Sequence, residues 1–199
     1  MGKEISKENN LSGLLLAGGF SIRMGSDKAL ITHEGIPMFE RAEKLLSQLC
    51  SPVYISIRDE QVSKIGNARV ITDTGSSHGP LSGLFAAFNR YPKQAFLVIP
   101  VDMPHLTTRF LHQYLIARRN PEMDATVIRD QSGSIQPLVA IYEPTSARII
   151  AEQFTAHQYS VKGLLRKLRV NEVDYLGDQH LLANYNRPED WISKRIELE

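Results

Sequence analysis

The sequence predicts an α/β fold with a mostly parallel central sheet, and three observations support this prediction. Short apolar, β-like runs alternate along the chain with segments whose apolar residues recur at helical spacing. The run at residues 95–99, AFLVI, is apolar throughout, which is typical of a strand buried on both faces of a parallel sheet. Gly18 and Gly19 follow the first run directly, at the strand end where sheets of this class bind ligands.

Local patterns predict the individual elements. Proline is favoured at the first position of a helix, because the N–H that it lacks has no helical partner there, so Pro37 and Pro80 indicate helix starts. Short β-branched or aliphatic runs indicate strands. The predicted strands are 14–17, 53–57, 69–72, 95–99, 125–128 and 137–142. The predicted helices begin at 37 and 80 and otherwise cover 107–117, 145–154, 161–168 and 188–196.

Length and composition indicate a soluble globular protein. The chain has 199 residues, of which 42% are hydrophobic and 23% charged, and a chain of this size buries a core without disulfides. The 23 Lys and Arg residues nearly balance the 22 Asp and Glu residues, giving a formal net charge of +1, so we expect no nucleic-acid partner. The sequence has no apolar run near the ~18 residues of a membrane span and no apolar leader among its first ten residues. We therefore expect a cytoplasmic protein with no membrane partner.

The segment at residues 16–30 carries the strongest chemical signal. Gly18 and Gly19 let the backbone turn sharply and approach a ligand without an intervening Cβ atom. Exposed N–H groups in such a turn form an anion-binding concavity. Arg23 and Lys28 add positive charge that suits a polyphosphate. The glycine spacing matches neither the dinucleotide-binding G-x-G-x-x-G pattern nor the P-loop.

Two acidic residues, Asp73 and Asp102, each follow a hydrophobic strand run, so both should lie at the carboxyl edge of the sheet. Mg²⁺ prefers one or two carboxylates together with substrate phosphates. We expect Asp102, which lies between two prolines, to bind this metal, and a helix cap is the alternative. Asp73 lies in the sequence TDTG, which would also suit an ordinary Asx turn.

Other reactive residue types do not predict a competing site. The single Cys50 excludes a disulfide framework, and we expect it to be buried. The six histidines show none of the spacings typical of zinc sites. A basic cluster in the C-terminal half is either a solvated helix face or a surface for an anionic second substrate; it comprises Lys162, Arg166, Lys167 and Arg169.

A family resemblance is carried by four segments. Residues 16–30, LAGGFSIRMGSDKAL, resemble the LAGGxSxRMGxDKAL signature of the molybdenum cofactor guanylyltransferases, the molybdopterin-guanine dinucleotide biosynthesis protein A family. Asp73 with GPLSGL at 79–84, PVDMP at 100–104 and NYNRPED at 184–190 resemble further motifs of that family. The resemblance covers most of residues 12–191 and implies a Rossmann-like, three-layer nucleotidyltransferase fold.

The resemblance implies a role for individual residues. The catalytic residues are Asp102, Lys28 and Arg23, and Asp102 is the metal ligand. The nucleotide-binding residues are Leu16, Ala17, Gly18, Gly19, Lys28, Ser56, Asp73, Pro80, Leu81 and Asp102. Asn184 and Asn186 are candidate contacts to the acceptor or to a second metal ion. The chain departs from the family at Val101, which replaces a cysteine, at Arg187, which replaces a threonine, and at Ser56, which stands where an asparagine often contacts the nucleotide.

The implied reaction is the Mg²⁺-dependent transfer of GMP from GTP to molybdopterin, with release of pyrophosphate. Relatives that use CTP tend to read LAAG, so Gly18 is expected to contribute to guanine preference by leaving room for the base. Two alternatives remain open. One is a related enzyme, such as a molybdopterin cytidylyltransferase or a sugar-phosphate or phospholactate nucleotidyltransferase, and the other is a nucleotide-binding regulatory module without turnover.

We expect residues 1–11 to form a flexible tail and residues 12–199 to form a single nucleotidyltransferase domain. Within it, residues 12–105 should bind the nucleotide and residues 106–199 the acceptor. Besides GTP and molybdopterin, the resemblance implies transient contact with cofactor-insertion proteins or with the molybdoenzymes that receive the product.

Overall fold

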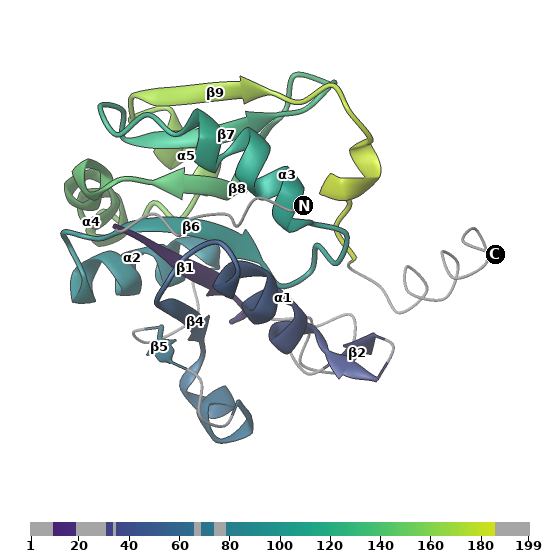
Figure 1. Ribbon diagram of the computed structural model, residues 1–199. Helices are drawn as coiled ribbons and strands as arrows, with labels where there is room; N and C mark the ends of the chain where they lie inside the picture. Colours follow the sequence, from purple (N-terminus) through teal and green to yellow (C-terminus); the bar gives the residue numbers. More distant parts are fainter. Residues whose placement is uncertain (1–9, 19–30, 34, 66–68, 74–78, 186–199) are drawn as a thin grey trace.

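The computed structural model describes residues 10–18, 31–33, 35–65, 69–73 and 79–185, and it has a layered α/β architecture (Figure 1). Its central sheet has seven strands in the order β5-β4-β1-β6-β8-β7-β9. Neighbouring strands are parallel except around β8, which runs antiparallel to β6 and β7. The predicted, mostly parallel sheet is confirmed. The strands are β1 (Leu11–Leu16), β4 (Val53–Ile57), β5 (Val70–Thr72), β6 (Ala95–Pro100), β7 (Ala125–Arg129), β8 (Ile135–Tyr142) and β9 (Val170–Asp174).

Helices cover both faces of the sheet, because successive strand residues point to opposite sides. In β1, Leu11 and Leu15 belong to the core shared with α1 and α3, whereas Leu14 and Leu16 belong to the core shared with α2, α4 and α5. Figure 1 shows α1 and α3 on the near face of the sheet and α2 and α4 behind it. The helices are α1 (Met38–Ser47), α2 (Pro80–Arg90), α3 (Thr108–Tyr114), α4 (Ala147–Thr155) and α5 (Val161–Leu165). The three predicted layers are confirmed.

The helix starts follow local chemistry. Pro80 is the first residue of α2, as predicted. Pro37 instead precedes α1 and pairs with Thr32 in a two-stranded hairpin of β2 (Thr32–His33) and β3 (Ile36–Pro37), so that helix begins at Met38. Thr107 caps α3, where its hydroxyl accepts a hydrogen bond from the Phe110 amide at 3.1 Å.

The largest departure from the predicted elements is β9, which the sequence does not indicate. Its residues, VNEVD, include three polar side chains, and β9 is an edge strand that pairs with β7 alone among the described strands. The predicted helix at 107–117 breaks after Tyr114 and continues as a 3₁₀ turn at Ile116–Arg118, and α5 ends at Leu165. The predicted helix at 188–196 lies outside the described residues.

The expected boundary at residue 11 is wrong by one residue. Leu11 is already part of β1 and is fully buried, because it packs in the core shared with α1. Strands from both expected halves build one sheet: β1, β4, β5 and β6 come from residues 12–105, apart from Leu11, and β7, β8 and β9 come from residues 106–199. Among the described helices, none has the length and apolar character needed to cross a membrane.

The start of α2 packs unusually close to the ends of β1 and β4. A Cβ atom on Gly83 would lie 2.4 Å from Ser56 Oγ and 2.7 Å from Leu16 Cδ2. Glycine at this position therefore allows the helix to reach the strand ends, and any larger residue would push it away.

We expect Gly83→Ala to lower the free energy of unfolding by about 1–3 kcal/mol, because overpacking displaces neighbouring groups. Urea unfolding measures this change. Gly163→Ala in α5 is the control, since its Cβ would lie 3.3 Å from the nearest described atom, Ser160 Cβ. Equal losses of unfolding free energy in the two variants would show that the close approach at Gly83 is unimportant for stability.

Candidate functional site

The candidate site lies at the carboxyl edge of the sheet, where four parallel strands end together. The register pairs Leu16 of β1 with Ser56 of β4 on one side and with Pro100 of β6 on the other. Beyond the strands, the Ala17 amide donates to the Ser56 carbonyl at 2.9 Å, and the Val101 amide donates to the Leu16 carbonyl at 3.1 Å. These bonds align the residues that follow β4, β1 and β6.

Asp73 joins this edge from β5 and lies beside Gly18. Its amide donates to the Ile57 carbonyl at 2.9 Å. Its carboxylate accepts a hydrogen bond from the Ser56 hydroxyl at 2.8 Å. A Cβ atom on Gly18 would lie 3.0 Å from Asp73 Oδ2. The space beside Gly18 is therefore bordered by this carboxylate, and the contribution of Gly18 to guanine preference stays a prediction.

The Asp73 carboxylate is held in an environment that disfavours its charge. The residue is 6% exposed, and burial raises its pKa from 3.8 to about 6. The hydrogen bond from Ser56 and the positive charge of Arg58 oppose this rise in pKa but do not cancel it. A perturbed carboxyl group at a sheet edge is typical of a binding or catalytic site.

Ser56 is 1% exposed, and its hydroxyl bonds to Asp73. In the structure, Ser56 therefore holds the Asp73 carboxylate by a hydrogen bond. Direct contact of Ser56 with a nucleotide stays a prediction. Ala17 and Leu16 are also buried, so a ligand would meet their main chain rather than their side chains. Gln61 was missed by the sequence analysis, because no sequence pattern marks it. It is 1% exposed, and its side-chain Nε2 donates to the Ala17 carbonyl at 3.4 Å.

Pro80 and Leu81 stand where α2 begins at the same edge. The Pro80 ring is exposed, whereas Leu81 is fully buried in the core shared with α4. A ligand can thus contact the ring of Pro80, and it can contact Leu81 only through the main chain.

Asp102 is half-buried and follows β6 at the edge. Its carbonyl accepts a hydrogen bond from the Tyr185 amide at 2.8 Å. This bond brings the exposed Asn184 into the neighbourhood of Asp102, although the two are far apart in the sequence. The remaining predicted site residues, Gly19, Arg23, Lys28 and Asn186, lie outside the described residues.

The donor groups suit a divalent cation that shares its coordination with a ligand. Among the described residues, no group of three or more His, Cys, Asp or Glu side chains could enclose a metal ion. A single partly exposed carboxylate, Asp102, at the carboxyl edge of the sheet fits Mg²⁺, which is bound by one or two carboxylates plus phosphates and waters.

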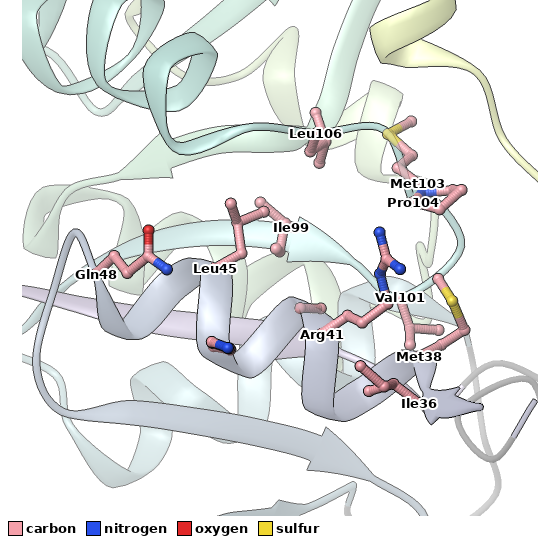
Figure 2. Close-up of a pocket in the computed structure, with 12 residues that line it drawn as sticks. Ile36, Met38, Arg41, Leu45, Gln48, Ile99, Val101, Met103, Pro104 and Leu106 are labelled. Atoms are coloured by element: carbon pink, nitrogen blue, oxygen red, sulfur yellow. The ribbon is translucent and has the colours of Figure 1, made fainter. Parts of the chain in front are cut away.

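A cavity of about 280 Å³ lies behind the Asp102 loop (Figure 2). It is lined by Val101 and Met103, the neighbours of Asp102, and by Arg41 and Leu45 of α1. Figure 2 shows that the Arg41 side chain extends from α1 toward the loop. The loop thus borders this cavity, while Val101 and Met103 are also buried in the core shared with α1.

The four cations of the basic cluster in the C-terminal half have three different surroundings. Arg169 forms an ion pair with Asp124 at 2.9 Å, and hydrogen bonds from Arg169 lower the pKa of Asp124 to about 2. Lys162 and Arg166 line a separate cavity of about 410 Å³ beside α5. Glu172 also lines this cavity. Lys167, the fourth cation, donates a hydrogen bond to the side-chain carbonyl of Gln158 at 2.7 Å. Cys50 is fully buried, as predicted.

A mostly parallel sheet that places Gly18, Asp73 and Asp102 at its carboxyl edge agrees with the fold expected of a nucleotidyltransferase. The family model described as "MobA-like NTP transferase domain" matches residues 13–173. The chain belongs to this family.

Curated relatives carry molybdenum cofactor names. The "Molybdenum cofactor biosynthesis bifunctional protein" of Synechocystis sp. is 30% identical over 195 residues, which cover 96% of this chain and 55% of that protein. The chain thus spans about half the length of this relative. The "Probable molybdenum cofactor guanylyltransferase" of Geobacillus sp. is 30% identical over 191 residues, covering 92% of this chain and 97% of the relative.

Solved structures share the fold. Molybdopterin-guanine dinucleotide biosynthesis protein A from Archaeoglobus fulgidus matches with a TM-score of 0.79 at 20% identity, covering 94% of this chain and 100% of the other. A Mycobacterium tuberculosis protein described as a manganese complex matches with a TM-score of 0.66 at 15% identity, covering 95% of this chain and 99% of the other. At these identities, the likeness supports the fold alone.

Burial of Asp73 predicts a pH-dependent stability. The unfolded carboxyl ionises near pH 3.8, whereas the folded one keeps its proton to about pH 6. Below pH 4, Asp73 is protonated in both states and its ionisation does not affect the free energy of unfolding. Between pH 4 and pH 6 this free energy falls, because the unfolded state releases the proton more easily, and above pH 6 the loss is complete. The loss is at most about 3 kcal/mol. Relative to wild type, Asp73→Asn should gain stability over this pH range, as measured by urea unfolding from pH 3 to pH 8.

The control for this experiment is Asp130→Asn. Hydrogen bonds, chiefly from Ser132, lower the pKa of the Asp130 carboxyl, so wild type should lose stability relative to this variant as the pH falls. A difference between Asp73→Asn and wild type that does not change from pH 3 to pH 8 would contradict the raised pKa of Asp73.

Proposed function

We propose that this protein transfers GMP from GTP to the terminal phosphate of molybdopterin, forming the guanine dinucleotide cofactor and pyrophosphate. The observation that carries the proposal is the placement of Gly18, Asp73 and Asp102 at one sheet edge, in a chain whose family signature spans residues 16–30. The names of the curated relatives support the same substrate pair.

The spacing of the two carboxylates suits an elongated nucleotide. Asp73 follows β5 and Asp102 follows β6, and these strands lie three positions apart in the sheet, with β4 and β1 between them. At about 4.8 Å per strand, their ends are about 14 Å apart. A nucleoside triphosphate placed across Gly18 meets Asp73 with one end and Asp102 with its phosphates.

The reaction needs positioning and charge neutralisation more than proton transfer. The terminal phosphate of molybdopterin attacks the α-phosphorus of GTP, one P–O bond forms, and the bond to pyrophosphate breaks. Lys28, Arg23 and the N–H groups of the glycine turn stabilise the charge on the leaving pyrophosphate. The phosphate nucleophile is already ionised at neutral pH, so no side chain has to act as a general base.

Asp102 is the residue that would hold Mg²⁺. When bound, this cation neutralises phosphate charge and orients the triphosphate. Asn184 and Asn186 are proposed to contact the acceptor or a second metal ion, since the Tyr185 amide ties their segment to the Asp102 carbonyl. The proposed setting is the cytoplasm, with transient contacts to cofactor-insertion proteins or molybdoenzymes that take up the product.

Product chromatography tests the proposal. The protein is incubated with Mg²⁺, molybdopterin and, in turn, GTP, CTP, ATP or UTP, and the dinucleotide and pyrophosphate are measured. The guanine dinucleotide is expected with GTP. A product with CTP alone would indicate a cytidylyltransferase, and turnover only with sugar phosphates or phospholactate would indicate another acceptor. No pyrophosphate with any pair would mean a binding module.

Asp102→Asn should fold normally and lose about 10²–10³-fold or more in turnover, because the amide removes the charge that attracts the metal. Steady-state kinetics at ordinary Mg²⁺ concentration checks this. Asp174→Asn is the control, since Asp174 is an exposed carboxylate that ends β9 at the same edge of the sheet. Wild-type turnover in Asp102→Asn would remove the metal assignment.

Gly18→Ala should lower kcat/KM for GTP by about tenfold or more, equivalent to ~1.4 kcal/mol, and lower the weak use of CTP less. The added Cβ would press on Asp73 Oδ2, which lies 3.0 Å from its position. The same substitution in an Asp73→Ala background separates the causes. A small additional loss there means that Gly18 acts through Asp73, and an undiminished loss means that it acts on the ligand directly.

A further inference from the structure

We propose that Tyr185, together with His105, is a positioning residue for Asp102 and sets the geometry in which that carboxylate meets a divalent metal and the nucleotide phosphates. This inference rests on the proposed function, because it takes Asp102 as the metal ligand. The family signature does not point to either residue. His105 follows the PVDMP segment, and Tyr185 occupies the unspecified middle position of the NxN motif.

Main-chain hydrogen bonds hold the Asp102 segment on both sides. Before Asp102, the Val101 amide donates to the Leu16 carbonyl of β1 at 3.1 Å. After its Cα atom, the Asp102 carbonyl accepts from the Tyr185 amide at 2.8 Å. The first bond extends the sheet, and the second comes from the far end of the described chain. Because a side chain's direction follows its own backbone dihedrals, the second bond limits how the carboxylate can turn.

Tyr185 also contacts this loop through its side chain. Its hydroxyl shares a hydrogen bond with Nε2 of His105, with 2.5 Å between oxygen and nitrogen. The two rings meet edge to face, with centroids 5.2 Å apart. Tyr185 is 2% exposed and His105 is partly exposed, so this contact is partly buried. One residue therefore bridges the loop from Asp102 to His105.

The segment that carries Tyr185 is itself anchored. The His180 ring lies against the His105 ring, with centroids 3.9 Å apart and the ring planes tilted by 35°. The His180 amide donates to the Asp178 carboxylate at 2.9 Å, which caps a 3₁₀ turn at Gln179–Leu182. Leu182 at the end of this turn is buried in the core shared with α3. The segment that precedes Tyr185 is thus held in place by the His180 ring, by the capped 3₁₀ turn and by the buried Leu182.

The side of the loop that faces α1 is partly packed and partly hollow. Val101 and Met103 are buried in the core shared with α1, and together with Pro104 they also line the 280 Å³ cavity. Figure 2 shows Met103 and Pro104 facing the Arg41 side chain. The main-chain hydrogen bonds described around Asp102 run to β1 and to Tyr185.

Tyr185→Phe tests the proposal, because it keeps the ring and the main-chain amide and removes only the hydroxyl. Loss of a residue that orients a metal ligand typically costs about 10–100-fold in metal affinity or activity. We expect about tenfold weaker Mn²⁺ binding in the presence of GTP, measured by electron paramagnetic resonance of free Mn²⁺. We also expect kcat to fall by a similar factor with little change in KM for GTP, and the amides of residues 101–106 to exchange hydrogen faster.

Tyr175→Phe is the matched control. Tyr175 is 4% exposed, and its hydroxyl donates to the Asp178 carbonyl at 3.0 Å within the same C-terminal segment. Its ring packs on Phe110 and Tyr114 of α3. This variant should lose a comparable amount of stability, measured by urea unfolding, and keep wild-type Mn²⁺ binding and wild-type exchange at residues 101–106.

His105→Phe and the double variant that combines it with Tyr185→Phe complete a double-mutant cycle. Because both single changes remove the same hydrogen bond, the double variant should bind Mn²⁺ about as weakly as either single variant. Wild-type Mn²⁺ binding and loop exchange in Tyr185→Phe would overturn the proposal, as would equal losses in Tyr175→Phe. Independent, multiplicative losses in the double variant would overturn the role of the His105–Tyr185 bond.

The readouts separate this proposal from the proposed function. If wild type binds Mn²⁺ with GTP but forms no guanine dinucleotide, the assignment of acceptor or base is wrong, while the Mn²⁺ and exchange comparisons still decide the role of Tyr185. If wild type forms the dinucleotide and Tyr185→Phe does so with unchanged kcat and Mn²⁺ affinity, the proposed function stands and the positioning role is wrong.

Discussion

The hydrogen bonds at the carboxyl end of β1 are the constraint on which the rest of the candidate site depends. β1 lies between β4 and β6, and its last residues bond to both: Ala17 donates to Ser56, and Leu16 accepts from Val101. Parallel strands that start in register end at one edge, so the segments that follow them meet there. These bonds therefore fix the positions of Gly18 and Asp102 relative to each other.

A chain of close contacts at this edge accounts for its pattern of small residues. The absent Cβ of Gly83 leaves room for Ser56 Oγ, Ser56 donates to Asp73, and the other carboxylate oxygen borders Gly18. Two glycines thus enclose a hydrogen-bonded Ser–Asp pair from opposite sides. The same enclosure removes water from Asp73 and raises its pKa, so the arrangement that places the carboxylate also destabilises its ionised form.

The two halves of the chain meet at Asp102. β8 runs antiparallel beside β6 and attaches β7 and β9 to the same sheet. β9 ends at the same carboxyl edge, and from there the chain runs to the Asp102 loop and contacts it through Tyr185 and His180. Residues far apart in the sequence therefore share one loop, and the geometry of Asp102 depends on the second half as well as on the strand that precedes it.

By itself, the sequence determined the α/β class, most strands and helix starts, and the residues that follow the strands, because apolar periodicity, proline and glycine act over a few neighbouring residues. Apolar periodicity did not reveal β9, because an edge strand needs little apolar surface. Only the tertiary structure decided which groups surround the carboxylates. Ser56 and Asp73 are 17 residues apart, and His105 and Tyr185 are 80 apart. No local pattern encodes such pairs, because they arise from how the strands order in the sheet and from where the chain returns.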